Sequence, residues 1–303
     1  MSRKKVKIGL ALGSGGWRGL AHIGVLKVLE KNGISIDYIT GSSIGALVGG
    51  LYAYYGNIGE LEKIVDNIGY LDMFHALSDP RAELGLLKGN KFVAFLENYL
   101  RGAKIEDLKI PFKAATTDIL TGETVYLDGG NLATAIRASI SIPIVLAPVD
   151  INGKRLVDGG NSTPIPTEEV RRMGADIVIG VNLYGNIFPL TAAMEGQMKL
   201  NAREIFRLSY QMLLNQMAKK NLEDADIALN PKIPEGKFNL FKNFVKEKGT
   251  VLCGEEAMAA EMGRLRGLLE RRCYNSLSLG DRLTVGLRVL VPPIGVRIPI
   301  PQP

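Results

Sequence analysis

The stretch "DYITGSSIGALVGGLYAYY", residues 37–55, decides the fold. A short apolar segment over 36–40 predicts a buried strand, and residues 44–55, apolar all round, predict a buried helix. Residues 41–45 between them read G-x-S-x-G, a pattern that holds a serine on a sharp turn between a strand and a helix. The sequence therefore predicts a strand–turn–helix unit with Ser43 at the turn.

Ser43 is the candidate nucleophile, because the glycine spacing selects it over the neighbouring hydroxyl of Ser42. Gly41 and Gly45 allow strand and helix to approach closely around it. The helix that starts there directs its positive end at negative charge developing on a substrate. The structural alternative is that these small residues merely pack a strand–helix junction.

A second glycine-rich stretch, "GSGGWRG" at residues 13–19, lies between a predicted strand and a predicted helix. Its backbone N–H groups suit an anion, including the oxygen that becomes negative when a nucleophile attacks a carbonyl. A tight turn and a dinucleotide-binding loop are the alternatives. Against the latter, the acidic residue expected at the end of the second strand is replaced by Gly41-Ser42-Ser43.

Asp158 in Asp-Gly-Gly, residues 158–160, is the candidate base. It ends a predicted strand, where α/β sheets usually bind ligands, and the glycines allow close access. An ordinary Asp-Gly turn is the alternative. Hydrolases with a G-x-S-x-G turn order their residues serine, acid, histidine, but no histidine follows His75. The chain's other histidine, His22, is expected to pack within its own helix. A desolvated carboxylate, its pKa raised above about 4, can instead accept the serine proton directly.

The remaining pattern predicts an α/β fold with three α/β/α layers and a mostly parallel central sheet covered on both faces. Predicted strands cover 6–12, 36–40, 111–117, 123–126, 155–157, 176–183 and 227–229. Predicted helices cover 20–31, 44–55, 61–68, 91–100, 132–139, 166–173, 199–222 and 253–272. We expect one catalytic domain over residues 1–272 and an irregular, basic, proline-rich tail over 273–303.

Composition narrows the class of protein. The first apolar run is too short for a signal peptide, and the longest falls short of the roughly 20 residues of a membrane span. Two cysteines in 303 residues favour a reducing compartment, and no His or Cys pair has metal-ligand spacing. We therefore expect a cytoplasmic protein without metal or cofactor.

Residues 271–303 carry +4 of the net charge of +6. This tail is either a solvated basic segment or a contact with an anionic membrane, such as its inner face, or with an acidic partner. Basic and aromatic residues do not interleave as in a nucleic-acid surface, so no nucleic acid is expected. The sequence does not define an oligomeric state.

The three motifs, in this order, resemble the patatin-like phospholipases, and "LAHIGVLKVLEKNGI", "AIRASISIPIVLAPV", "LVDGGNSTPIP", "GADIVIGVNL" and "ADIALNPKI" are similar to the small bacterial members. The resemblance spans roughly residues 6–270. It implies hydrolysis of acyl esters of (lyso)phospholipids or related lipids by a Ser–Asp dyad through an acyl-enzyme, without cofactor or metal. Its site residues would be the nucleophile Ser43, the base Asp158, an oxyanion hole of Gly15, Gly16 and the backbone of Arg18, and the supporting glycines Gly13, Gly19, Gly41, Gly45, Gly159 and Gly160.

The chain departs from the family's pattern at two positions. Ser14 stands where the G-x-G-x-x-G frame has its first glycine, and Trp17 is bulkier than the expected small residue. Trp17 is therefore a candidate wall of the acyl site, and residues 238–245 are either a membrane-facing flap or core packing. Two rival functions stay open: a regulatory or adaptor protein on the same fold, and a nucleotide-binding oxidoreductase.

Overall fold

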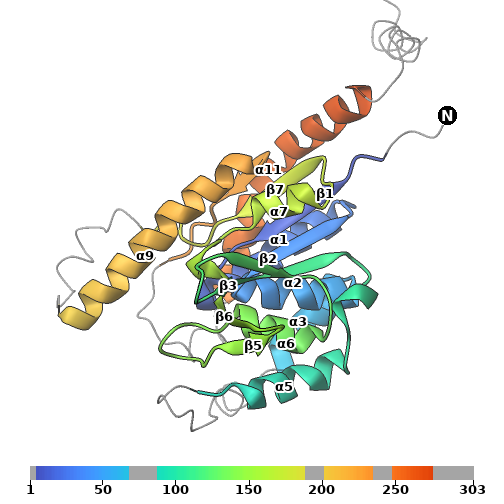
Figure 1. Ribbon diagram of the computed structural model, residues 1–303. Coiled ribbons are helices and arrows are strands. Elements are labelled where there is room, and N and C mark those ends of the chain that lie inside the picture. Colours follow the sequence, from blue (N-terminus) through green and yellow to red (C-terminus); the bar gives the residue numbers. More distant parts are fainter. Residues whose placement is uncertain (1–4, 68–86, 188–200, 235–247, 276–303) are drawn as a thin grey trace, which may run out of the picture.

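The computed structural model describes residues 5–67, 87–187, 201–234 and 248–275, and Figure 1 shows their arrangement. Its centre is an eight-stranded sheet of order β5-β6-β3-β2-β1-β7-β8, with β4 also paired to β3. The strands are β1 (Ile8–Leu12), β2 (Tyr38–Ser42), β3 (Phe112–Asp118), β4 (Thr124–Leu127), β5 (Val149–Ile151), β6 (Lys154–Asp158), β7 (Ile177–Val181) and β8 (Ile227–Leu229).

The sheet has a parallel half and an antiparallel half. Strands β3, β2, β1, β7 and β8 run parallel to one another. Strands β4 and β6 each pair antiparallel with β3, and β5 pairs antiparallel with β6. The three-layer fold with a mostly parallel sheet is thus confirmed, with the addition that the β6 edge reverses direction.

Helices cover both faces of the sheet. They are α1 (Leu20–Lys31), α2 (Ile44–Tyr55), α3 (Ile58–Asn67), α5 (Asn90–Leu100), α6 (Leu132–Ser139), α7 (Thr167–Arg172), α9 (Ala202–Asn221) and α11 (Lys248–Asn275). Alternate residues of β1 point to opposite faces: Leu10 and Leu12 join the large core under α1, α2, α3, α5, α6 and α11, whereas Ala11 joins a smaller core under α7 and α9. The larger core is the one that supports the Ser43 turn.

Several predicted boundaries shift in the structure. The strand expected over 36–40 is β2 (Tyr38–Ser42), so it reaches the serine turn itself, and helix α11 continues to Asn275, past the predicted domain boundary at 272. Strand β5 was missed because its sequence, Val-Asp-Ile, has a charged centre and none of its residues is buried, unlike the equally short β8. Its hairpin partner is reached through Asn152 and Gly153, both at positive φ, the Asn-Gly signal of a tight hairpin. Residues 238–245 and most of the predicted tail lie outside the described ranges.

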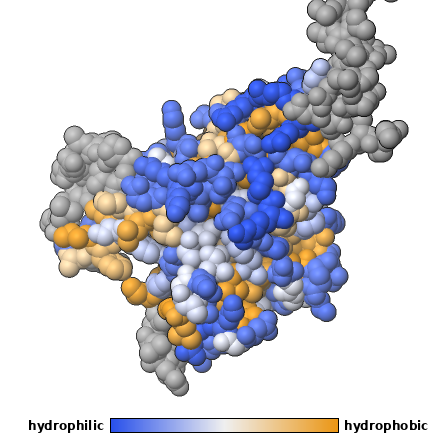
Figure 2. Space-filling view, turned by 45° about the horizontal axis from the view of Figure 1, so that its top comes forward, coloured by the Kyte–Doolittle hydropathy of each residue, from blue (hydrophilic) through white to orange (hydrophobic). Residues whose placement is uncertain are grey.

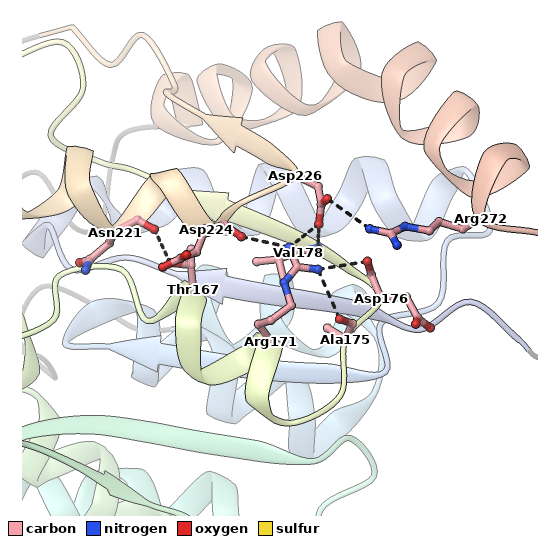
Figure 3. Close-up of polar contacts among 9 residues, drawn as sticks. All are labelled: Thr167, Arg171, Ala175, Asp176, Val178, Asn221, Asp224, Asp226 and Arg272. Carbon is pink, nitrogen blue, oxygen red and sulfur yellow. Dashed lines mark hydrogen bonds and ion pairs between the residues drawn. The ribbon is translucent and has the colours of Figure 1, made fainter. Parts of the chain in front are cut away.

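A polar cluster joins the elements at the amino ends of β7 and β8 (Figure 3). Asp226, just before β8, accepts from Arg171 of α7 at 2.6 Å and from the Val178 N–H at 2.8 Å, and Arg272 of α11 lies 3.9 Å away. Arg171 also donates to the carbonyls of Asp176 and Asp224. This cluster ties both helical layers to the sheet at the edge opposite the serine turn.

Candidate active site

Ser43 occupies a strained turn between β2 and α2. Its backbone has φ 54° and ψ −122°, a conformation that costs a non-glycine residue of order 1–3 kcal/mol. Its N–H donates to Ser139 Oγ at 2.9 Å, and that hydroxyl donates to the Ala115 carbonyl at 2.6 Å. A side chain of α6 thus holds the turn against β3, which explains how the strain is sustained.

Glycines around the turn let three backbones meet. A Cβ on Gly45 would lie 2.1 Å from the Leu12 carbonyl oxygen, and one on Gly41 would lie 2.4 Å from the Gly45 carbonyl oxygen. A Cβ on Gly19, which ends the glycine-rich stretch, would lie 2.1 Å from the Ile44 side chain. Side chains at these positions would separate α2 from β1 and from the glycine loop.

Asp158 ends strand β6, as the sequence predicts. The rule used to expect a ligand at this strand end, however, does not apply to β6. The rule about carboxyl ends applies to parallel strands, and β6 runs antiparallel to β3, with Asp158 opposite Thr116. Strand β6 therefore starts beyond the carboxyl end of β3 and runs inward. Because Ser42 lies opposite Ala115 on the other side of β3, the inward end of β6 reaches the level of the serine turn.

The two side chains meet directly. Ser43 Oγ donates to Asp158 Oδ2 at 2.5 Å, across 115 residues of chain, and Asp158 Oδ1 accepts from the Gly160 N–H at 2.8 Å. Each residue is 5% exposed. Burial raises the pKa of Asp158 to about 6, while the hydrogen bonds from Ser43 and Gly160 oppose that rise. The hydrogen bonds from Ser43 and Gly160 are the interactions that stabilise its charge.

Neither His22 nor Ser42 is placed to replace Asp158 or Ser43 as a reactive group. His22 Nε2 contacts the Gly13 carbonyl at 2.8 Å, and complete burial lowers the pKa of the ring to about 4, so it is neutral near pH 7. Ser42 Oγ is fully buried and has no hydrogen-bond partner in the described part of the chain. His75 lies outside the described ranges.

The glycine loop lies against the Asp158 turn. A Cβ on Gly160 would lie 2.9 Å from Ser14 Oγ and 3.0 Å from Asp158 Oδ1, and one on Gly159 would lie 2.2 Å from the Ala115 carbonyl oxygen. Hydrogen bonds from the Gly13 N–H to the Val181 carbonyl and from the Ser14 N–H to the Pro164 carbonyl fix the start of the loop. The three sequence motifs therefore meet at one edge of the sheet.

The rest of the loop forms a short helical turn, η1 (Gly16–Gly19), that leads into α1. Gly15 precedes it and Gly16 has φ 59°, so the N–H groups of Gly15 and Gly16 stand at a helix N-terminus. Ser14, the departure from the family frame, is not among the residues at positive φ. Trp17 is 3% exposed in the core, with the Arg18 guanidinium 5.3 Å from its ring centroid.

Two tyrosines near Ser43 and Asp158 carried no signal in the sequence. Tyr184 OH lies 3.0 Å from Ser14 Oγ, and Tyr210 of α9 donates to Asn161 Oδ1, three residues after Asp158. Burial raises the pKa of both phenols, and the negative charge of Asp158 adds to the effect. Tyr210 lies some fifty residues further along the chain, so only folding brings it to this edge.

Helix α9 extends from the body of the protein beyond this contact (Figure 1). Its exposed face presents Ile205, Phe206, Met212 and Leu213, an apolar patch at the left of Figure 2. None of the described helices combines the length and apolar character needed to cross a bilayer. No group of three or more His, Cys, Asp or Glu side chains in the described ranges is arranged to hold a metal ion.

Comparisons with known proteins give the family. A family model described as patatin-like phospholipase matches residues 10–171, more than half of the chain. An uncharacterized NTE family protein of Mycobacterium bovis is 39% identical over 180 residues, which cover 59% of this chain and 50% of that protein. The lysophospholipase nte1 of Emericella nidulans is 33% identical over 180 residues, 58% of this chain and 12% of the relative.

The chain thus matches about half the length of the Mycobacterium relative and a small part of the fungal one. Among solved structures, VipD from Legionella pneumophila superposes with a TM-score of 0.47 and 13% identity, over 88% of this chain and 67% of that one. The extent of the family-model match, across the glycine loop, the serine turn and Asp158, shows that the chain belongs to the patatin-like phospholipase family.

Proposed function

We propose that this chain is a serine hydrolase that cleaves acyl ester bonds of (lyso)phospholipids or related lipids with a Ser43–Asp158 dyad. The observation that carries the proposal is the 2.5 Å hydrogen bond from Ser43 Oγ to Asp158 Oδ2, between two buried side chains. A pKa of about 6 leaves Asp158 ionised at neutral pH yet basic enough to accept a proton in the transition state.

The reaction has two half-steps. Asp158 accepts the proton as Ser43 Oγ bonds to the ester carbonyl carbon, and the N–H groups of Gly15, Gly16 and Arg18 hold the oxyanion. The alcohol leaves with the proton from Asp158, which gives the acyl-enzyme. Asp158 then deprotonates a water that attacks the acyl carbon, the fatty acid leaves, and the proton returns to Ser43 Oγ.

Two observations support a lipid as the substrate. The Emericella relative is named a lysophospholipase, and the exposed apolar face of α9 lies on the helix whose Tyr210 contacts the Asp158 turn. An aggregated or membrane-bound ester suits such an apolar surface better than a small soluble one. Transient contact of the protein with an anionic membrane is part of this proposal, as is its cytoplasmic location.

Labelling and hydrolysis test the dyad. A fluorophosphonate probe should label the wild type but not Ser43→Ala. It should also label Ser42→Ala, because the hydroxyl that this change removes is buried and unpaired among the described residues. Ser43→Ala and Asp158→Ala should each lower kcat/KM for p-nitrophenyl esters and lysophosphatidylcholine by at least about 1000-fold, with unchanged circular dichroism.

Two outcomes would contradict the proposal. A folded Asp158→Ala protein that hydrolyses esters at the wild-type rate removes the carboxylate from the mechanism. A wild-type protein that neither reacts with the probe nor hydrolyses any ester supports the adaptor alternative. Asp150→Ala is the matched control, because Asp150 is an exposed carboxylate on the neighbouring strand β5 and should leave activity unchanged.

A further inference from the structure

Arg137 of α6 is a buried cation with no part in the proposed reaction steps. It is 3% exposed, and burial lowers the pKa of its guanidinium to about 10, so it stays charged at neutral pH. Its acceptors in the described part of the chain are two carbonyls and a hydroxyl, and its Nε has no partner there. Because burying a cation without a carboxylate costs folding energy, its presence points to a role for the groups that it holds.

The guanidinium joins two segments that are far apart in the sequence. Arg137 Nη1 donates to Ser141 Oγ at 2.6 Å. Its Nη2 donates to the carbonyls of Lys88 and Ala147, at 2.6 and 2.9 Å. A Cβ on Gly89, which has φ 74°, would lie 2.0 Å from the guanidinium Nε, so only glycine there leaves room for it. The side chain thus fixes both ends of the loop between α6 and β5 and attaches that loop to the chain just before α5.

The end of α6 and the start of this loop contact both members of the proposed dyad. The Ser139 hydroxyl accepts from the Ser43 N–H at 2.9 Å. Two residues later, the Ser141 carbonyl accepts from the Asp158 N–H at 3.0 Å. Because Arg137 holds the hydroxyl of that same Ser141, two successive contacts connect its guanidinium to the backbone of Asp158.

The loop needs a restraint because part of it is strained. Ile144 has φ 72°, which is rare for a β-branched residue, and it is 73% exposed, so its own burial does not hold it in place. A parallel bridge between Leu87 and Leu146 and the two carbonyl contacts of Arg137 supply the restraint. Without the guanidinium we expect the loop to relax and to displace Ser141.

We propose that Arg137 is a positioning residue that holds the backbone of Asp158 through Ser141 and so keeps the proposed base against Ser43. The proposal rests on the proposed dyad and adds the residue that aligns it. Arg137 is too buried to contact a substrate, so it acts on the chemical step and not on binding. A displacement of about 1 Å between reacting groups lowers turnover by about 100-fold.

The kinetics of Arg137→Gln test the proposal. For a p-nitrophenyl ester, kcat should fall about 100-fold while KM stays within about threefold of the wild type. Arg171→Gln is the matched control, because Arg171 also donates to several carbonyls, but at the amino edge of the sheet. Both variants should unfold at lower urea concentrations, whereas only Arg137→Gln should lose turnover. Equal kcat values in the two folded variants would overturn the proposal.

A second variant, Ser141→Ala, covers a folding failure of Arg137→Gln. It removes only the hydroxyl that the guanidinium holds, so the fold should persist and kcat should fall about tenfold. In the double variant kcat should be no lower than in Arg137→Gln alone, because both changes break the same contact. A loss of about 1000-fold, the product of the two separate effects, would mean that the residues act independently and would overturn the proposal. An unchanged kcat in Ser141→Ala has the same consequence.

Crystal structures of the variants separate this proposal from the hydrolysis itself. In Arg137→Gln the distance from Ser43 Oγ to Asp158 Oδ2, 2.5 Å in the wild type, should exceed about 3.5 Å, and in Arg171→Gln it should stay unchanged. A lengthened distance supports the positioning role even in a protein that hydrolyses no ester. An unchanged distance in Arg137→Gln overturns that role and leaves the proposed dyad intact.

Discussion

Two carboxylates at opposite edges of the sheet have different surroundings. Asp158, beside the serine turn, accepts hydrogen bonds from a hydroxyl and a backbone N–H. Asp226, at the amino edge, faces the guanidinium groups of Arg171 and Arg272 and accepts from the Val178 N–H (Figure 3). Paired cations stabilise a carboxylate as an anion, whereas burial without them raises its affinity for a proton. The first arrangement suits a base and the second a structural anchor.

Each half of the sheet contributes one residue of the proposed dyad. Ser43 follows β2 in the parallel half, whereas Asp158 ends β6 in the antiparallel half. Strand β3 lies between β2 and β6 and forms a hydrogen bond toward each side. Its Ala115 carbonyl accepts from Ser139, which holds the serine turn, and its Thr117 Oγ1 donates to the Asp158 carbonyl at 2.9 Å. A central strand thus fixes the distance between Ser43 and Asp158, the proposed nucleophile and base, which come from strands of opposite direction.

The largest effect expected from this contrast is on the pH dependence of turnover. Because protonated Asp158 cannot accept the Ser43 proton, kcat should fall about tenfold per pH unit below about 6, roughly 100-fold between pH 8 and pH 4. The measurement is a pH–rate profile with a short-chain ester, with circular dichroism at each pH as the control for folding. A flat profile from pH 8 to pH 4 would show that a group with a raised pKa near 6 does not limit the rate.

The next effect is on stability, with opposite signs at the two edges. Since the folded-state pKa of Asp158 is raised from 3.8 to about 6, ionising it costs folding energy as pH rises through 6, and that cost is absent below pH 4. Asp158→Asn should therefore raise the free energy of unfolding at pH 8 by about 2 kcal/mol, and the gain should vanish near pH 4.

Asp226→Asn should instead lower the free energy of unfolding by about 1–2 kcal/mol at pH 8, because it leaves two arginines facing a neutral amide in a partly exposed site. Its kcat should stay within threefold of the wild type. Urea unfolding of the three proteins measures both changes. Destabilisation of the same sign and size by both variants would mean that Asp158 is an anchor like Asp226.

A further effect is expected at the support of the serine turn. Ser139→Ala removes the acceptor of the Ser43 N–H and the donor to the Ala115 carbonyl, both buried, and should cost about 1–2 kcal/mol of stability. Activity should fall about tenfold, because the strained turn loses one of its constraints. Ser139→Thr, which keeps the hydroxyl, should restore most of the activity. Unchanged stability and activity in Ser139→Ala would show that the glycines alone hold the turn.

Much of the fold was predictable because its signals are local. The helices over 20–31, 44–55 and 132–139 were predicted with the observed bounds. Their signals, apolar periodicity and a terminating glycine or proline, lie within the segment itself. The order of strands and helices indicated the layers. The hairpin of β5 and β6 carried an Asn-Gly signal, but the residues of β5, Val-Asp-Ile, show no buried apolar run.

The sequence by itself determined the family and the candidate residues, because glycines and a serine at fixed spacing report a backbone that leaves no room for side chains. Only the tertiary structure decided that β6 runs antiparallel, that Asp158 reaches Ser43, and that Ser139, Tyr184 and Tyr210 surround the pair. The raised pKa of Asp158 also depends on folding. Its main cause is desolvation, which arises from all the groups that the fold packs around the carboxylate and cannot be inferred from its neighbours in the sequence.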